Sequence, residues 1–131
     1  MSHLPLLLLR YLNALKHRRI KPGDHDCAQM AGGWVAVVTG DHPGAAFRGG
    51  YRSLAQGRKL LRETGFDTLG DLAASHLYEV PATDLRLGDI AILSDQGQEH
   101  FGIVGGPHIH VLAPEGLDIV PLSRAVRVFR P

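Results

Sequence analysis

The spacing of the apolar residues changes once along the chain, at Val80-Pro81, and this change limits the possible folds more than any other feature. Before it, apolar residues recur at three- and four-residue intervals, the period of an amphipathic helix. After it, short apolar runs alternate with turns rich in Gly, Pro and Asp, which is typical of antiparallel strands. The sequence therefore predicts an α+β fold in which N-terminal helices pack on a C-terminal antiparallel β-meander.

The periodicity predicts helices over residues 4–16, 27–39, 53–64 and 68–77. We expect one domain over residues 1–131, with residues 41–80 as a helical insertion. Gly32-Gly33 lies inside the second helix, where each glycine costs about 1 kcal/mol relative to alanine. This cost indicates that another backbone packs closely against the helix there.

The expected strands cover residues 90–93, 100–104, 108–112, 117–122 and 127–129. If Gly105-Gly106-Pro107 is a three-residue hairpin loop, Val104 pairs with His108 and Gly102 pairs with His110. That register places His100, His108 and His110 on one face of the sheet. A two-residue loop would instead place His100 and His110 on opposite faces.

The formal net charge of +1 and the scattered Lys and Arg residues give no basic patch for nucleic acid. A single cysteine excludes an intrachain disulfide and suits folding in a reducing cytoplasm. No positive residue precedes the leucine run at residues 4–9, and the run is too short to cross a bilayer. We therefore expect a chain made in the bacterial cytoplasm without a signal peptide or a membrane span, and read this run as the start of a core helix.

The single cysteine, Cys27, comes at the expected start of the second helix, directly after Pro22-Gly23-Asp24-His25-Asp26. Asp26 suits the N-cap, and Gln29 completes a capping-box pattern. A thiol in the first helical turn lies near free backbone N–H groups, which lower its pKa and can hold an oxyanion. The alternative is that Cys27 is a small buried hydrophobe and Asp26 only a cap.

A cysteine nucleophile also needs a base, and the chain has eight histidines. His3, His17 and His42 are expected in solvent, and His76 is expected to be a half-buried packing residue. His25 lies two residues before the cysteine and could modulate the thiol, or be only a turn residue. The segment Arg48-Gly49-Gly50-Tyr51-Arg52 could be a binding surface, but a tyrosine that anchors a loop is the commoner case.

Four motifs in order resemble the NlpC-type branch of papain-like cell-wall cysteine peptidases. They are Asp26-Cys27, Gly88-Asp89-Ile90-Ala91, His100-Phe101-Gly102-Ile103-Val104-Gly105 and Ile109-His110-Val111. The resemblance implies a papain-like core, with Cys27 as nucleophile, His100 as general base and His110 as the residue that orients it. It implies no cofactor and no metal, and His108 is at most a modulator. The implied substrates are peptidoglycan stem peptides, cut at an amide bond.

The chain departs from this family in two places. Ala28-Gln29 replaces the usual small polar residue and glycine after the cysteine, and the helical insertion is additional. The insertion, His25-Asp26-Cys27 and the Arg48–Arg52 segment together resemble a small branch encoded in phage and prophage tail modules. This implies a phage tail-tip component that opens the cell wall locally, is incorporated in the virion tail, and contacts tail hub or tail-tip proteins.

Two other functions compete with peptidase activity. A catalytically silent structural or assembly protein of the phage tail could keep the same fold. A metal site could form from Cys27, His100 and either His110 or His108, although the close spacing of strong zinc motifs is missing.

Overall fold

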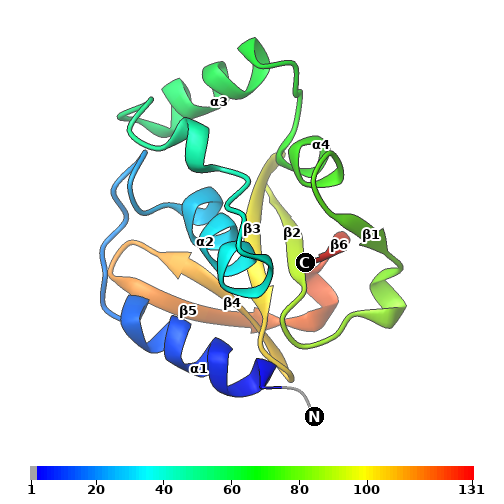
Figure 1. Ribbon diagram of the computed structural model, residues 1–131. Helices are drawn as coiled ribbons and strands as arrows, with labels where there is room; N and C mark the ends of the chain where they lie inside the picture. Colours follow the sequence, from blue (N-terminus) through cyan, green and yellow to red (C-terminus); the bar gives the residue numbers. More distant parts are fainter. Residues whose placement is uncertain (1–2) are drawn as a thin grey trace.

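The computed structural model describes residues 3–131, which form a helical layer and a six-stranded sheet (Figure 1). The helices are α1 (Leu4–Leu15), α2 (Cys27–Thr39), α3 (Leu54–Glu63) and α4 (Leu69–Ala74). The strands are β1 (Tyr78–Val80), β2 (Ile90–Asp95), β3 (Gln98–Val104), β4 (His108–Ala113), β5 (Gly116–Pro121) and β6 (Arg127–Arg130). Short 3-10 helices cover Ala45–Phe47 (η1), Ala82–Asp84 (η2) and Leu122–Arg124 (η3). No helix within residues 3–131 is long and apolar enough to cross a membrane.

All strand pairs are antiparallel, and the strands are arranged in the order β1-β6-β2-β3-β4-β5. The α+β class with N-terminal helices and an antiparallel sheet is therefore confirmed. The meander holds for β2 to β5, but β6 returns to pair with β2 and separates β2 from β1. The sequence did not predict β1, because a three-residue strand that is largely exposed has too few residues to show an alternating pattern.

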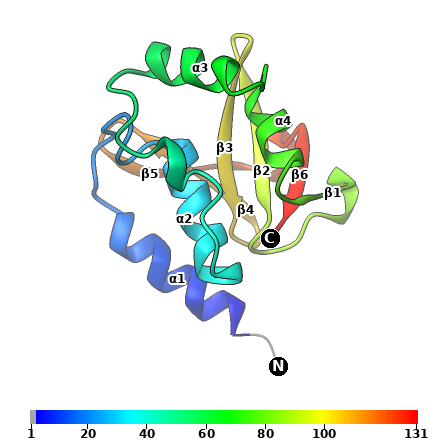
Figure 2. The ribbon, with the colours of Figure 1, turned by 45° about the horizontal axis from the view of Figure 1, so that its top comes forward.

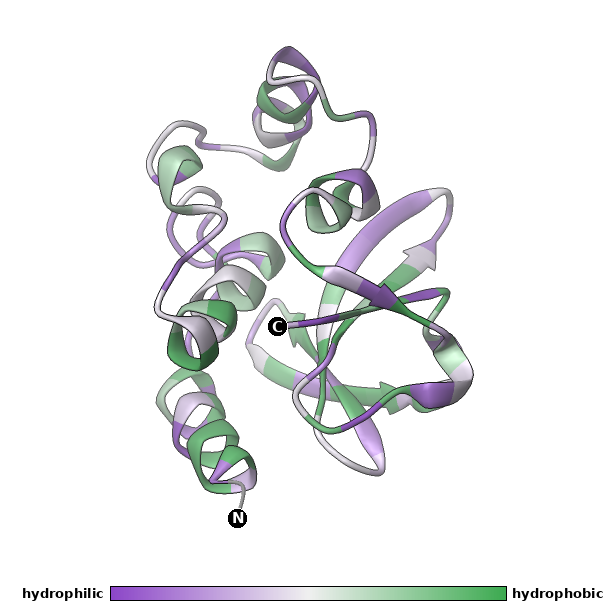
Figure 3. Cartoon of the chain, turned by 45° about the vertical axis from the view of Figure 1, so that its right-hand side comes forward, coloured by the Kyte–Doolittle hydropathy of each residue, from purple (hydrophilic) through white to green (hydrophobic). Residues whose placement is uncertain are grey.

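The main core lies between the helices and one face of the sheet. Helix α2 packs against β3, and Figures 1 and 2 show α1 and α2 side by side along the sheet. Figure 3 shows the same two layers and draws much of α2 and the central strands in the colour of hydrophobic residues. The core residues come from both layers and are largely removed from water: Leu8, Leu12, Leu15, Met30, Ala31, Trp34, Val35, Ala73, Ile90, Ile92, Phe101, Ile103 and Phe129. Their burial is the main force that holds α2 on the sheet.

The first three helices form close to where the periodicity predicts them, because capping residues bound their apolar stripes. Helix α2 begins after the Asp26 cap and ends at Gly40, whose φ of 86° is the left-handed conformation of a C-cap glycine. Helix α3 begins after Ser53, whose side chain accepts a hydrogen bond from the Gln56 N–H. Helix α4 ends at Ala74, so the predicted continuation to residue 77 is wrong, and His76 is exposed rather than half-buried.

The glycine pair in α2, Gly32-Gly33, leaves room for two side chains that pack on the helix. The prediction that another backbone packs closely there is wrong. A Cβ on Gly32 would lie 2.3 Å from Cε1 of His42, and a Cβ on Gly33 would lie 2.3 Å from the Tyr11 hydroxyl. That hydroxyl donates to the Met30 carbonyl at 2.6 Å. His42 is consequently half-buried against α2, so the prediction that it lies in solvent is wrong.

The hairpin between β3 and β4 has a different register from the one predicted. Ile103 pairs with His110 and Val104 with Ile109, and the Gly105 N–H donates to the His108 carbonyl at 2.9 Å. The loop therefore has two residues, and the first, Gly106, has the positive φ (97°) that a type II′ turn needs. Because a one-residue shift exchanges the faces of a strand, His108 and His110 lie on the opposite face from His100.

Asp89 of the Gly88-Asp89 motif binds a side chain of the last strand, β6. Asp89 is buried and accepts from the Arg86 backbone N–H at 2.8 Å. Its two carboxylate oxygens also accept from Arg130 on β6, at 3.0 and 2.9 Å. The carboxylate keeps the pKa of Arg130 above its usual value. The motif thus has a structural role, which is to hold β6 beside β2.

We expect Asp89→Asn to lower the free energy of unfolding by about 3 kcal/mol, because it removes one partner of a buried ion pair. Urea denaturation followed by circular dichroism measures this change. Arg86→Ala is the control, since its exposed side chain pairs with Asp84 at the surface and should contribute less than about 1 kcal/mol. Equal losses in the two variants would contradict the role given to Asp89.

Candidate active site

The start of α2 is held by the buried carboxylate of Asp26. One oxygen accepts from the Gln29 N–H at 2.9 Å, which is the predicted N-cap interaction. The other accepts from the Gly23 N–H at 2.9 Å and from the Tyr51 hydroxyl. These bonds join the preceding loop, the helix and the segment after η1, so the backbone at Cys27 is closely held. Tyr51 is buried and anchors its loop, the commoner of the two roles that the sequence allowed.

The second half of the predicted capping box does not form. The Gln29 side chain donates to the Gly44 carbonyl at 3.1 Å instead of reaching back to Asp26. Its Oε1 atom is buried and has no hydrogen-bond partner among the described residues. Gln29 therefore holds the loop that precedes η1, and only Asp26 caps the helix.

Cys27 is the first residue of α2, as predicted, and lies against an unpaired edge of β3. Strand β4 pairs with β3 only at Ile103 and Val104, so the rest of β3 is free on that side. Val104 donates its N–H toward Asp89 on the β2 side. Because N–H directions alternate along a strand, the N–H of Phe101 points to the free edge, where it interacts with the Cys27 thiol. The thiol thus lies beside the residue that follows His100.

Burial is the largest influence on the thiol and raises the pKa of Cys27 to about 11. The backbone N–H groups of Phe101, Ala28 and Cys27 act in the opposite direction, while the Asp26 carboxylate adds to the increase. The amides at the helix start do lower the thiol pKa, as predicted, but the prediction of a lowered pKa overall is wrong. Desolvation of the thiolate outweighs the nearby amides.

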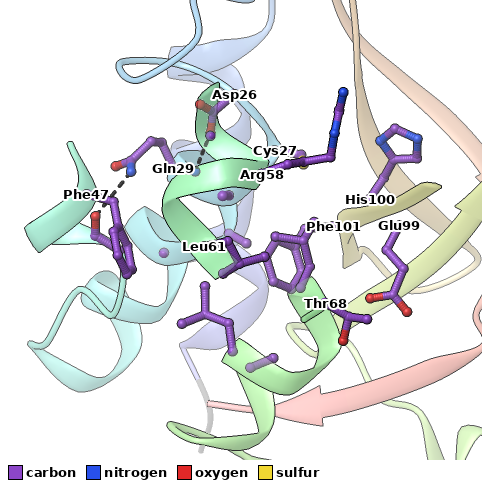
Figure 4. A pocket seen from close by; sticks show the side chains of 18 of the residues that line it. Asp26, Cys27, Gln29, Phe47, Arg58, Leu61, Thr68, Glu99, His100 and Phe101 are labelled. Carbon is purple, nitrogen blue, oxygen red and sulfur yellow. Dashed lines mark hydrogen bonds between the residues drawn. The ribbon is translucent and has the colours of Figure 1, made fainter. Parts of the chain in front are cut away.

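His100 is exposed on β3 and lines the same pocket as Cys27 (Figure 4). It pairs with Leu93, so its side chain leaves the strand on the face opposite to Phe101. Within residues 3–131, His100 and Cys27 share a pocket but are not hydrogen-bonded to each other.

His110 and His108 lie away from this pocket. The His110 ring packs on Gly105, so closely that a Cβ at that position would clash with the ring. His110 also borders a second hollow beside α1. Burial lowers the pKa of His110, with a smaller contribution from His108. The predicted contact between His100 and His110 is therefore wrong, because it depended on the three-residue loop. The polar residues that do share the His100 face are Asp95 and Gln98, which pair with each other.

The same register separates the residues of the proposed metal site. His108 and His110 are on the other face of the sheet from His100. Within residues 3–131, no three His, Cys, Asp or Glu side chains are grouped as metal ligands. The structure thus gives no support to the Cys/His metal alternative.

His25 is buried although it precedes the cysteine by only two residues. Its backbone forms an isolated bridge with Lys21, and its Nε2 atom has no hydrogen-bond partner in the part of the chain that the structure describes. Burial, followed by the charge of Arg18, lowers its pKa. His25 therefore packs beneath the loop as a neutral ring, and it does not line the pocket that contains Cys27.

The pocket at Cys27 has a volume of about 640 Å³ and lies between α2, α3, α4 and the free end of β3. Figure 4 shows Cys27, Arg58 and His100 around its mouth and Phe101 and Leu61 deeper inside. Sequence reasoning missed Arg58 as a pocket residue. Arg58 and Arg62 are four residues apart on α3, where like charges repel, and this unfavourable spacing was the available signal.

A family model covers residues 3–131, which is almost the whole chain. The chain belongs to the family DUF6950, a domain of unknown function. No curated protein matches it.

We expect alkylation of native Cys27 by iodoacetamide to accelerate about tenfold per pH unit from pH 7 to pH 10, because only the thiolate reacts. In the same protein unfolded in urea, the rate should level off above about pH 9, since an exposed thiol has a pKa of about 8.5. Mass spectrometry measures both rates at the single cysteine. A native rate that is already constant near pH 7 would show a thiolate and contradict the effect of burial.

Proposed function

We propose that this chain is a cysteine-nucleophile hydrolase with a papain-like, NlpC-type core. One observation carries the proposal. Cys27 begins α2 at the free edge of β3, beside the Phe101 N–H, and shares a pocket with His100, the adjacent residue on that strand. A nucleophile on a helix start and a base on a neighbouring strand are the two parts that acyl transfer requires.

The proposed reaction begins with a protonated thiol, because burial keeps the pKa of Cys27 high. The His100 imidazole takes the thiol proton as the Sγ atom attacks the amide carbon, forming an S–C bond. The C–N bond then breaks, and the leaving amine takes the proton from His100. A water molecule, deprotonated by His100, hydrolyses the thioester and restores the thiol. Activation thus occurs during attack rather than through a stored thiolate.

Backbone amides near the sulfur supply the proposed oxyanion site. The N–H groups of Cys27 and Ala28 are in the first turn of α2, where they have no partner within the helix. The helix dipole favours negative charge at the same place. Asp26 acts as a positioning residue, because its carboxylate fixes the backbone that presents these amides. His110 has no part in the proposed mechanism, since it borders a second hollow and not the pocket that contains Cys27.

We propose peptidoglycan stem peptides as substrates and a phage tail tip as the setting. The order of the motifs supports this, together with the insertion that contains α3 and α4. The pocket is open to solvent at His100 and apolar inside, with Leu61 and Phe101 buried, so a short peptide can bind along it. A tail hub protein is the proposed partner in the virion.

A second candidate is a structural or assembly role in the tail without catalysis. It is favoured by exposed apolar residues at the helical surface, where Leu6 is 48% and Leu9 is 56% exposed on α1 and Val37 is 44% exposed on α2. Such side chains suit a contact with another protein. Binding to purified tail hub protein that is lost in Leu9→Glu but kept in Cys27→Ala would support this role.

Hydrolysis of purified muropeptides, followed by chromatography and mass spectrometry, tests the catalytic proposal. We expect Cys27→Ala to abolish cleavage and His100→Ala to reduce kcat by about 100-fold or more, as for loss of a general base. His108→Ala and His110→Ala are the matched controls and should retain activity, because neither residue lines the pocket that contains Cys27. Loss of activity in His110→Ala equal to that in His100→Ala would contradict the site. Full activity in Cys27→Ala would refute the proposed nucleophile.

A further inference from the structure

Arg58 lines the pocket and has no partner among residues 3–131. It lies in the middle of α3 and lines the pocket together with Cys27 and His100. In Figure 4 its side chain extends from α3 past Cys27, and its guanidinium lies between Cys27 and His100 in this view. Within residues 3–131 it makes no ion pair or hydrogen bond, whereas the adjacent Lys59 pairs with Glu63 at 3.8 Å.

The carboxylates nearest to Cys27 and His100 in the chain are engaged elsewhere. Both oxygens of Asp26 accept hydrogen bonds, and Glu99 accepts from the Gly70 N–H at 3.0 Å. Arg62 lines the same pocket and also has no ion-pair partner among the described residues. Asp67 and Asp95 also line the pocket, but within residues 3–131 neither is paired with Arg58 or Arg62.

The position of Arg58 is coupled to that of the cysteine through Tyr51. The Tyr51 ring packs on Gly57, where a Cβ would lie 3.1 Å from two ring carbons. The Tyr51 hydroxyl donates to Asp26. Tyr51 thus contacts the residue before Arg58 and the residue before Cys27. Tyr51 therefore fixes the backbone from which the exposed Arg58 side chain extends relative to the start of α2.

We propose that Arg58 is a specificity-determining residue that binds a carboxylate on the peptide substrate, within about one residue of the scissile amide. A guanidinium presents N–H donors in a planar fork that matches the two oxygens of a carboxylate. The inference rests on the proposed hydrolase function and adds a substrate class, acidic peptides. It also gives α3 a role, which is to carry the residue that recognises substrate.

The test uses two synthetic peptides that differ only in a free carboxylate or a carboxamide on the residue next to the scissile bond. We expect the wild type to cleave the carboxylate peptide with a kcat/KM about 10- to 100-fold higher, the range for loss of a charged hydrogen bond. Arg58→Gln should bring this ratio close to one by slowing cleavage of the carboxylate peptide alone. Lys59→Gln is the matched control and should keep the wild-type ratio.

A binding measurement separates failure of this inference from failure of the hydrolase proposal. In the Cys27→Ala background, fluorescence anisotropy should show tighter binding of the carboxylate peptide, and adding Arg58→Gln should remove that preference. If the wild type cleaves neither peptide but this preference is present, the hydrolase proposal fails and the role of Arg58 holds. An unchanged preference in Arg58→Gln, in cleavage or in binding, would overturn the role of Arg58.

Discussion

The buried carboxylate of Asp26 is the interaction on which the rest of the site depends. It caps α2, holds the turn at Gly23 and accepts the Tyr51 hydroxyl. Through Tyr51 it also connects α2 to Gly57 on α3. A buried charge is stable only when its oxygens are hydrogen-bonded, and these bonds come from three separate segments. The location of Cys27 relative to α3 therefore follows from satisfying one carboxylate.

The sheet contributes to the site through the part of the β3 edge that β4 leaves unpaired. Strand β4 pairs with β3 only at Ile103 and Val104, which leaves the N–H of Phe101 free to face the thiol. The same lack of pairing exposes His100 at the end of the pocket. Closely packed neighbours then desolvate the thiol, which favours its neutral form.

The sequence predicted the secondary structure better than the pairing within the site. Helix α2 and its Asp26 cap depend on residues that are close in sequence, so capping and apolar spacing located them correctly. The register of the β3–β4 hairpin depends on whether Gly105 joins the loop or the ladder, and glycine can do either. That one residue decided the faces of His100 and His110, so an error there removed His110 from the site.

By itself the sequence determined the α+β class, the cysteine at a helix start and the histidine on a strand, because these follow from local spacing and capping. Only the tertiary structure decided which groups meet in space. It placed β6 beside β2, the Phe101 N–H beside the thiol and Arg58 at the pocket mouth. It also raised the pKa of Cys27, because desolvation depends on how many distant segments pack around the sulfur and not on the residues next to it in the chain.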